Sequence, residues 1–320
     1  MNASVAAANG LGPDRFGATS WKVAGLCAGV AFLDGFDTQS LAPAAKSIAD
    51  SFRIPMSAFG PIFSASQIGF LVGAFAFGPL GDRFGRKRLL GLAAVVFGLS
   101  TLATAFTASY EALFLARILA GVGLGGATPN FVALASEFSP QRLRARVVTS
   151  LWAAVPLGGM AGAFASALIL PRFGWQAIFL LGGAAPVAIA ALLFAALPES
   201  TEAGARSTRG AATGRLADLF GEGRTASTAW LWLASFMTWT VLIVMSFWTP
   251  PLLQRSGWSA PSAAQILALN NAGGVAGTLL LGAALTRLRP QAALVGALVG
   301  AAVFLAAMGA AVSSPALVAA

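Results

Sequence analysis

The sequence predicts an all-α membrane protein whose spanning helices form a bundle. Hydrophobic residues make up 57% of the 320-residue chain and charged residues only 10%, and the mean hydropathy is +0.79. Apolar segments of about 20 residues, the length that a helix needs to cross a bilayer, recur along the chain. Basic residues concentrate in every second connection between these segments, which is the pattern of loops that remain in the cytoplasm. These proportions are not those of a soluble domain.

The length criterion predicts about nine spanning helices. Residues 1–20 are polar and small and lack the apolar core of a cleaved signal, so we expect a cytoplasmic tail, and the first span then serves as an uncleaved insertion signal. The expected helices cover residues 22–45, 58–80, 88–108, 111–136, 147–170, 175–197, 229–253, 262–285 and 291–312.

The basic residues predict the orientation of these helices. Of the 20 Lys and Arg residues, 15 fall in the N-terminal tail or after even-numbered helices. The positive-inside rule therefore predicts a cytoplasmic N-terminus and a multi-pass protein of the inner (plasma) membrane. The 15 residues are Arg15, Lys22, Arg83, Arg86, Lys87, Arg88, Arg142, Arg144, Arg146, Arg206, Arg209, Arg215, Arg224, Arg287 and Arg289, whereas Lys46, Arg53, Arg172 and Arg255 lie on the other side.

The longest connection divides six expected spans from three. Residues 198–228 are polar and rich in Ser, Thr, Gly and Arg, as in a linker between domains. The predicted organisation is a tail at 1–20, a six-helix bundle at 21–197, a cytoplasmic linker at 198–228 and a partial second bundle at 229–320.

An internal repeat supports that division. Shifting the sequence by 204 residues places Gly69, Gly73, Gly78 and Arg83 on Gly273, Gly277, Gly282 and Arg287. The eighth helix thus corresponds to the second, as in two related six-helix halves. Only residues 313–320 follow the ninth expected helix, too few for a span, so we expect helices ten to twelve to be absent from the second half.

Two carboxylates, Asp34 and Asp37, lie within the first expected span. A charged Asp at the centre of such a helix costs about 2.5–3.5 kcal/mol, and residues three apart share a helix face. We therefore expect this face to look into a protein interior or an aqueous cavity and to handle protons or ions. The plainer alternative is a pair of neutralised acids that hold neighbouring helices together.

One basic residue, Arg117, lies inside an expected span. It is about six residues from the outer end of the fourth helix, or roughly 9 Å deep, and Asp37 is roughly 12 Å deep by the same reckoning. An Asp37–Arg117 ion pair is therefore expected if both helices face one cavity. Asp34, nearer the midplane, is then the freer candidate proton carrier.

The connection after the second helix carries the strongest local signature. Its glycines permit a tight turn, Asp82 can pair with an arginine or cap a helix, and its bases keep it cytoplasmic. A loop that only sets topology is the alternative. The order of these residues resembles the signature loop of the major facilitator superfamily, in which it is associated with a conformational latch. The matching residues are Gly78, Asp82, Arg83, Gly85, Arg86 and Lys87.

A narrower resemblance involves other segments of the chain. Leu33-Asp-Gly-Phe-Asp-Thr38, the stretch Gly121–Asn130, Ser136–Pro140 and Phe173-Gly-Trp175 together resemble the aromatic acid:proton symporter family, and Pro198-Glu-Ser200 fits the wider superfamily. The resemblance implies a major facilitator-like bundle that takes up a benzoate, a hydroxybenzoate or a related acid together with protons.

The charged residues fit that implication chemically. An anionic substrate needs a cationic partner in a low-dielectric cavity, which Arg117 supplies. A carboxylate in an apolar site beside a second acid is readily protonated. We therefore hypothesise that the substrate carboxylate and Asp37 compete for Arg117, and that protonation of the acid frees the arginine. Asp34 and Asp37 are the candidate proton-coupling residues.

The aromatic ring of such a substrate needs apolar and π-bearing walls. Interfacial Trp and lipid-facing Phe are common in membrane proteins, so most aromatic candidates have a plainer explanation as membrane contacts. Adjacent amides within a span, in contrast, need partners inside the protein. The candidate substrate-binding residues are Arg117, Asn130, Trp152, Trp239, Asn270 and Asn271, with Phe247 and Trp248 as further aromatic candidates.

Other functions remain open or are excluded at this stage. The cargo could be another organic anion, a sugar or a drug, or the chain could be a truncated membrane protein that transports nothing. The chain has no His and one Cys, Cys27, so a Ser/His/Asp enzyme, a transition-metal site and an intrachain disulfide are not expected. We expect no cofactor and no nucleic acid; the expected partners are a small aromatic acid, protons and the bilayer, and the oligomeric state stays open.

Overall fold

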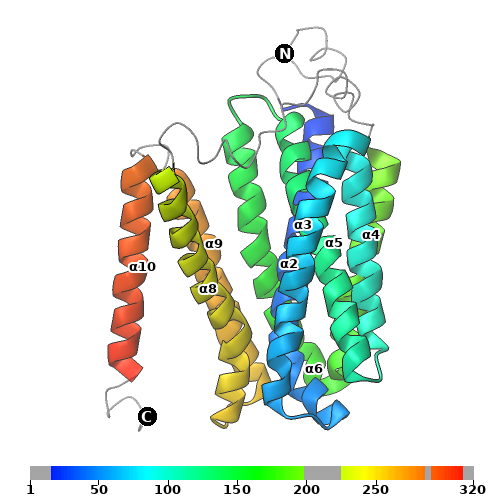
Figure 1. Cartoon of the computed structure of the whole chain (residues 1–320), viewed down its shortest axis with the longest axis vertical. Helices are drawn as coiled ribbons and strands as arrows, with labels where there is room; N and C mark the ends of the chain where they lie inside the picture. The colour runs from blue at the N-terminus through cyan, green and yellow to red at the C-terminus, as the bar shows by residue number, and fades with distance from the viewer. Residues whose placement is uncertain (1–15, 198–224, 285–289, 313–320) are drawn as a thin grey trace.

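The computed structural model describes residues 16–197, 225–284 and 290–312, and within these ranges all regular structure is helical. The all-α prediction is confirmed. Figure 1 shows long, roughly parallel helices, with α10 at the outer edge beside α9. The helices are α2 (Ala18–Phe52), α3 (Phe59–Phe84), α4 (Arg86–Ala105), α5 (Tyr110–Glu137), α6 (Arg144–Ala196), α8 (Thr225–Arg255), α9 (Ala260–Ala284) and α10 (Pro290–Val312), with a short 3₁₀ helix at Met56–Ala58.

The long helix α6 contains the two spans that the sequence separates at Phe173-Gly-Trp175. Gly174 has φ 74° and ψ 176°, so the helical path breaks there, and only glycine adopts this conformation without strain. Trp175 is buried directly after the break, and its Nε1 donates a hydrogen bond to Ser51 Oγ at 3.2 Å. This contact ties the break to the end of α2.

Helix α2 is longer than the sequence indicates. The expected span ends at residue 45, whereas the helix continues to Phe52 and stops where Arg53 adopts a left-handed conformation with φ 55°. Pro43 lies inside the helix. Packing of buried residues such as Ile48 against neighbouring helices outweighs the weak sequence signal for helix there.

Close helix pairs in the first bundle meet through glycine. A Cβ added to Gly158 of α6 would collide with the Phe32 carbonyl of α2, and one added to Gly69 of α3 would collide with the Ile118 carbonyl of α5. The absence of a side chain lets these backbones approach, as is common between membrane helices. These glycines thus let α2 pack closely against α6, and α3 against α5.

The glycines of the predicted repeat differ in their surroundings. Gly69 and Gly73 press against α5, but a Cβ on Gly273 or Gly277 of α9 would meet no described atom within 4 Å. Gly282 approaches Thr149 of α6 instead. Of the predicted linker at 198–228, residues 225–228 already belong to α8, which begins at Thr225. Residues 198–224, with the Pro198-Glu-Ser200 match, and residues 285–289, with Arg287 of the repeat, lie outside the described residues, so the division into two bundles remains a prediction.

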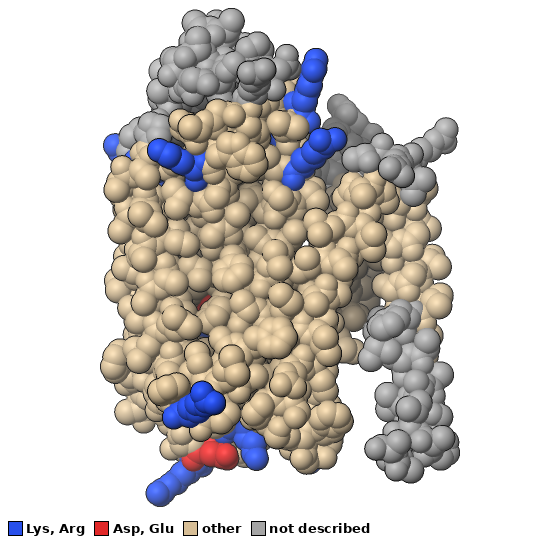
Figure 2. All heavy atoms as spheres, turned by 180° about the vertical axis from the view of Figure 1, so that it is seen from behind, with Lys and Arg blue, Asp and Glu red and all other residues tan. Residues whose placement is uncertain are grey.

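The helices have the length and composition of membrane spans. Six described helices are long and apolar enough to cross a bilayer, and α6, at 53 residues, is one of them. On the face in Figure 2, Lys and Arg lie at the two ends and acidic side chains project at the lower end, whereas the outer surface of the band between them is formed by other residues. The lengths, composition and charge distribution of these helices are those of a multi-pass membrane protein.

Helix α8 contacts the first bundle through one end only. Phe247 packs its ring 5.0 Å from that of Phe63, and Trp248 packs 5.7 Å from the same ring. Gln254 donates a hydrogen bond to the Pro43 carbonyl at 3.5 Å. Residues 229–242 of α8 are mostly exposed among the described atoms. Figure 1 shows α8 leaning toward the lower end of α2 and α3.

Candidate functional site

The centre of the site is an ion pair between α2 and α5. Arg117 Nη1 lies 2.9 Å from Asp37 Oδ2, and the side chains are only 1% and 3% exposed. Leaving either charge alone at this depth would be costly, because a buried ion without a partner loses its hydration. The expected pairing of these two residues is therefore present in the structure.

Two threonines of α4 complete the surroundings of the pair. Arg117 Nη2 donates to Thr101 Oγ1 at 3.2 Å and to Thr104 Oγ1 at 3.1 Å. Thr101 Oγ1 in turn donates to Asp37 Oδ1 at 3.1 Å. The guanidinium carbon lies 5.3 Å from the centre of the Phe179 ring, a distance at which a cation attracts the ring face. Arg117 Nε is buried without a described partner.

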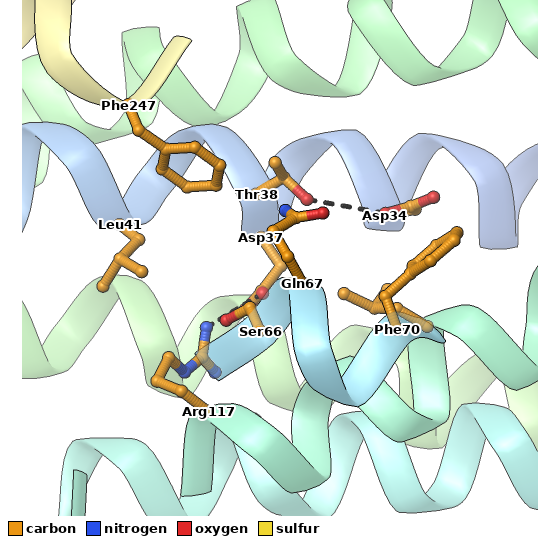
Figure 3. Close-up of a pocket in the computed structure, with 10 residues that line it drawn as sticks. Asp34, Asp37, Thr38, Leu41, Ser66, Gln67, Phe70, Arg117 and Phe247 are labelled. Atoms are coloured by element: carbon orange, nitrogen blue, oxygen red, sulfur yellow. Dashed lines mark hydrogen bonds and ion pairs between the residues drawn. The ribbon is translucent and has the colours of Figure 1, made fainter. Parts of the chain in front are cut away.

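A narrow pocket lies beside the pair, as Figure 3 shows. Asp34 faces the same pocket as Asp37, and its Oδ1 accepts a hydrogen bond of 3.5 Å from Thr38. This bond is longer than either hydrogen bond to Asp37, so Asp34 is the less firmly held acid. The lining comprises Asp34, Asp37, Thr38, Leu41, Ser66, Gln67, Phe70, Arg117, Leu124 and Phe247.

The pocket walls come from α2, α3, α5 and α8, so both parts of the chain that the linker separates contribute to it. Phe70 and Phe247 supply aromatic surface, and Ser66 and Gln67 supply polar groups. Ligand sites commonly have volumes of about 300–1,000 Å³. The enclosed space of this pocket is smaller than that in this conformation.

Several sequence-based candidates lie away from this pocket. Trp152 is 41% exposed and packs edge-on against Phe131, and Trp239 is 54% exposed on α8. Asn270 is exposed on α9. The structure does not bring these three residues to the pocket in this conformation, and their roles in binding remain predictions.

Asn130 lies at the other end of α5, near the α3–α4 turn. Its Nδ2 donates to the Phe77 carbonyl at 3.2 Å and to the Gly126 carbonyl at 2.8 Å. A Cβ on Gly81 would collide with its Oδ1. Asn130 thus joins α5 to α3, and its side chain does not line the pocket.

Asn271 belongs to a polar contact between the two parts of the chain. Gln39 of α2 donates from Nε2 to Ser246 Oγ of α8 at 3.1 Å and to Asn271 Oδ1 of α9 at 3.4 Å. All three side chains are buried, and Gln39 Oε1 has no partner among the described residues. Gln39 follows Asp37 by two residues, so it projects from a different face of α2 than the acid.

The predicted signature loop is helical apart from Gly85, because α3 continues to Phe84 and α4 begins at Arg86, and its charged residues form a network at the end of α5. Gly85, with φ 102°, makes the turn between α3 and α4. Arg86 pairs with Asp82 at 2.9 Å and with Glu137 at 2.9 Å. The guanidinium carbon of Arg83 lies 5.2 Å from the centre of the Phe84 ring. The loop is thus fixed to the first bundle, and its latch role remains a prediction.

Lys87 has a different environment from its neighbours in the loop. It is only 7% exposed, and its Nζ donates to the carbonyls of Phe194, at 3.3 Å, and Leu197 at the end of α6. A helix C-terminus presents carbonyls without partners and a partial negative charge, both of which an ammonium satisfies. The contacts of Lys87 therefore join α4 to α6.

Sequence reasoning missed the residues that α3 and α4 contribute. Thr101 and Thr104 are short polar residues in an apolar segment, and Ser66 and Gln67 are a polar pair in another. A search for polar residues at span depth would have found them, since such groups need partners inside a bundle. Their places beside Asp37 could not be predicted, because they are far from it in the sequence.

The chain is similar in sequence to known transporters. A sequence model described as the Major Facilitator Superfamily matches residues 27–320. The 4-hydroxybenzoate transporter of Pseudomonas aeruginosa is 35% identical over 301 residues, covering 85% of this chain and 67% of that protein. The 3-(3-hydroxy-phenyl)propionate transporter of Escherichia coli is 38% identical over 270 residues, covering 83% and 65%. The chain thus spans about two thirds of these relatives.

The fold is similar to solved transporter structures. A D-xylose-proton symporter has a TM-score of 0.70 at 20% identity and covers 85% of this chain and 70% of its own. A bacterial homologue of the human lysosomal transporter Spinster has a TM-score of 0.71 at 19% identity and covers 86% and 64%. These similarities describe the arrangement of helices and not the cargo.

Proposed function

The chain belongs to the Major Facilitator Superfamily, and from that premise we propose that it is a secondary transporter that couples uptake of an aromatic carboxylate to the entry of protons. The observation that carries the proposal is the buried Asp37–Arg117 pair at a pocket that also contains Asp34. An arginine in a water-poor site is a strong partner for a carboxylate, and acids beside it can carry protons.

The pocket supports an aromatic cargo. Phe70 and Phe247 offer ring faces within the same pocket as Arg117, so a benzoate-type acid could place its carboxylate at the arginine and its ring between the aromatic side chains. Relatives named as transporters of 4-hydroxybenzoate and gallate support this class of substrate. Similarity to a D-xylose-proton symporter concerns the fold and does not favour a sugar.

We propose alternating access as the mechanism. The pocket has walls from the first bundle and from α8, and relative motion of these parts would widen it on one side and narrow it on the other. Asp37 and the substrate carboxylate compete for Arg117, and protonation of the acid favours the substrate. The loop residues Asp82 and Arg86 stabilise one of the conformations as a latch.

The proposed orientation places the N-terminus in the cytoplasm and the protein in the inner membrane. Ser57 is exposed in the short 3₁₀ helix between α2 and α3 and would then face outward. Ala145 is exposed at the start of α6 and would face inward. A membrane-impermeant maleimide should label Ser57→Cys but not Ala145→Cys in intact cells, with Cys27→Ala as background. The reverse labelling would contradict the orientation.

Uptake of labelled 4-hydroxybenzoate by cells that express this chain tests the function. We expect accumulation that requires an inward proton gradient and that benzoate, gallate or another aromatic acid inhibits, while xylose does not. Asp37→Asn should abolish accumulation without preventing membrane insertion. Gradient-independent uptake by the unaltered chain, or inhibition by xylose alone, would contradict proton-coupled aromatic acid transport.

A further inference from the structure

Helix α4 supplies the groups that hold the Arg117 guanidinium, although no charged residue of α4 reaches the pair. Of the five N–H groups of an arginine, Arg117 directs one from Nη1 to Asp37 and two from Nη2 to Thr101 and Thr104. The Phe179 ring faces the guanidinium at 5.3 Å. Loss of the Asp37 contact would therefore still leave two hydrogen bonds and a ring contact on the arginine.

The two threonines differ in the acceptor to which each hydroxyl group donates its proton. Thr104 Oγ1 donates to the Ser100 carbonyl of its own helix at 3.0 Å, so its lone pairs face Arg117 whatever the state of the acid. Thr101 Oγ1 donates instead to Asp37 Oδ1, and that bond requires an oxygen of the acid that accepts. A hydroxyl both donates and accepts, and can therefore reverse this bond if Asp37 carries a proton.

We propose that these threonines are positioning residues that hold Arg117 as a fixed anchor for the substrate carboxylate while Asp37 takes up and loses its proton. Thr101 donates to the ionised acid and accepts from the protonated acid. Thr104 holds the guanidinium in both states. The moving partner of the ion pair is thus Asp37, and the arginine stays in place.

The proposal rests on the proposed function, since it assigns Arg117 a substrate carboxylate. The charged groups at this place are Asp34 and Asp37 of α2 and Arg117 of α5 among the described residues. The neighbouring groups from α3, α4, α6 and α8 are uncharged, namely Gln67, Thr101, Thr104, Phe179 and Phe247. Asp34 is therefore the one other group here whose titration must be separated from that of Asp37.

The first test is an infrared pH titration of the reconstituted chain. The carboxylic C=O band of Asp37 is assigned by its loss in Asp37→Asn, and that of Asp34 by its loss in Asp34→Asn. Thr101→Val removes a hydrogen bond to a charged acceptor, so the Asp37 band should appear at a proton concentration about tenfold lower than in the unaltered chain. Thr104→Val should leave this midpoint unchanged.

The second test is binding of labelled 4-hydroxybenzoate to the same samples. Thr104→Val should weaken binding about fivefold to tenfold, because the guanidinium loses a holding contact. Serine at either position keeps the hydroxyl and should restore the midpoint and the affinity. Thr128→Val is the control, since its hydroxyl bonds to the Leu124 carbonyl of its own helix.

The outcomes separate the two proposals. An unchanged Asp37 midpoint in Thr101→Val, an equal shift in Thr104→Val, or no restoration by serine overturns the role of the threonines. If a valine variant does not insert into the membrane, the alanine variant at that position replaces it in both measurements, with the same expected results. A shifted midpoint in a protein that binds no aromatic acid at any pH would instead contradict the proposed function and leave Thr101 in its role toward Asp37.

Discussion

Asp37 and Arg117 form a buried ion pair, with 2.9 Å between Oδ2 and Nη1, across 80 residues of sequence. Asp82 and Arg86 are joined by the same distance, but the Asp82 side chain is 58% exposed. Removing one partner of a buried pair leaves an uncompensated charge, whereas solvent screens the members of an exposed pair. The two pairs therefore differ in energy despite equal distances.

The first prediction follows from this contrast. Asp37→Ala and Arg117→Ala should each lower the free energy of unfolding by about 3–5 kcal/mol, and the double variant should fall short of their sum by about 1–3 kcal/mol. Asp82→Ala should cost about 0–1 kcal/mol. Reversible unfolding in mixed micelles measures all four. Strict additivity for Asp37 and Arg117 would show that the pair has no net coupling.

The second prediction concerns Asp34. Its carboxylate faces the pocket with a single long hydrogen bond from Thr38, so under the proposed mechanism we expect Asp34 to exchange a proton more readily than Asp37. Asp34→Asn should abolish accumulation against a gradient but retain exchange of labelled for unlabelled substrate. Asp50→Asn, an exposed change on the same helix, is the matched control. Accumulation at the unaltered level in Asp34→Asn would exclude it as a coupling residue.

The third prediction separates the aromatic residues that line the pocket from the aromatic candidates that lie outside it. Phe247→Ala and Phe70→Ala should each raise the KM for 4-hydroxybenzoate about twofold to tenfold, because an aromatic contact contributes about 0.5–1.5 kcal/mol. Trp152→Ala and Trp239→Ala, whose side chains lie outside the pocket in this conformation, should change it little. Initial uptake rates over a concentration series measure the difference. The opposite pattern would favour the tryptophans.

These examples show what the sequence predicts and where it stops. Span lengths follow from hydrophobicity, and the break at Gly174 follows from a glycine between two apolar runs, so both could be predicted. The Asp37–Arg117 pair could be predicted because charges inside a membrane need partners. The place of Phe70 in the pocket wall could not, because a phenylalanine gives the same sequence signal whether it faces lipid or a cavity. Phe247, in contrast, is one of the predicted aromatic candidates, and the structure places it in the pocket.

Asn130 shows the same limit for polar groups. Its place in a span indicates that it has a partner, but the partner is a backbone carbonyl, which no sequence pattern marks. Lys87 stands in a row of loop bases, and only the packing of α4 against the end of α6 distinguishes it from Arg88. The sequence identifies buried polar residues that need a partner, but the partner depends on which helices pack together in the fold.

The fourth prediction follows from Lys87. Its ammonium bonds to the Phe194 and Leu197 carbonyls, so Lys87→Met should lower the free energy of unfolding by about 1–3 kcal/mol through loss of charged hydrogen bonds to a helix end. Arg83→Met, at an exposed side chain in the last turn of α3, should change it by less than about 0.5 kcal/mol. Thermal unfolding of the purified variants checks both. Equal losses of stability in the two variants would mean that the contact of Lys87 with the end of α6 contributes no more than an exposed side chain.

The fifth prediction concerns the contact of Gln39 with Ser246 and Asn271. Gln39→Leu keeps the volume of the side chain but removes its two hydrogen bonds to α8 and α9. The conformation in which these helices contact α2 should therefore be destabilised by about 1–3 kcal/mol relative to conformations in which they have moved apart. Phe63→Cys and Phe247→Cys in a Cys27→Ala background report this motion, because the two rings now pack together. Gln39→Leu should slow their disulfide formation, and Asn270→Leu, next to Asn271 but exposed, should not. Unchanged cross-linking in Gln39→Leu would show that the aromatic contact alone holds the two parts together.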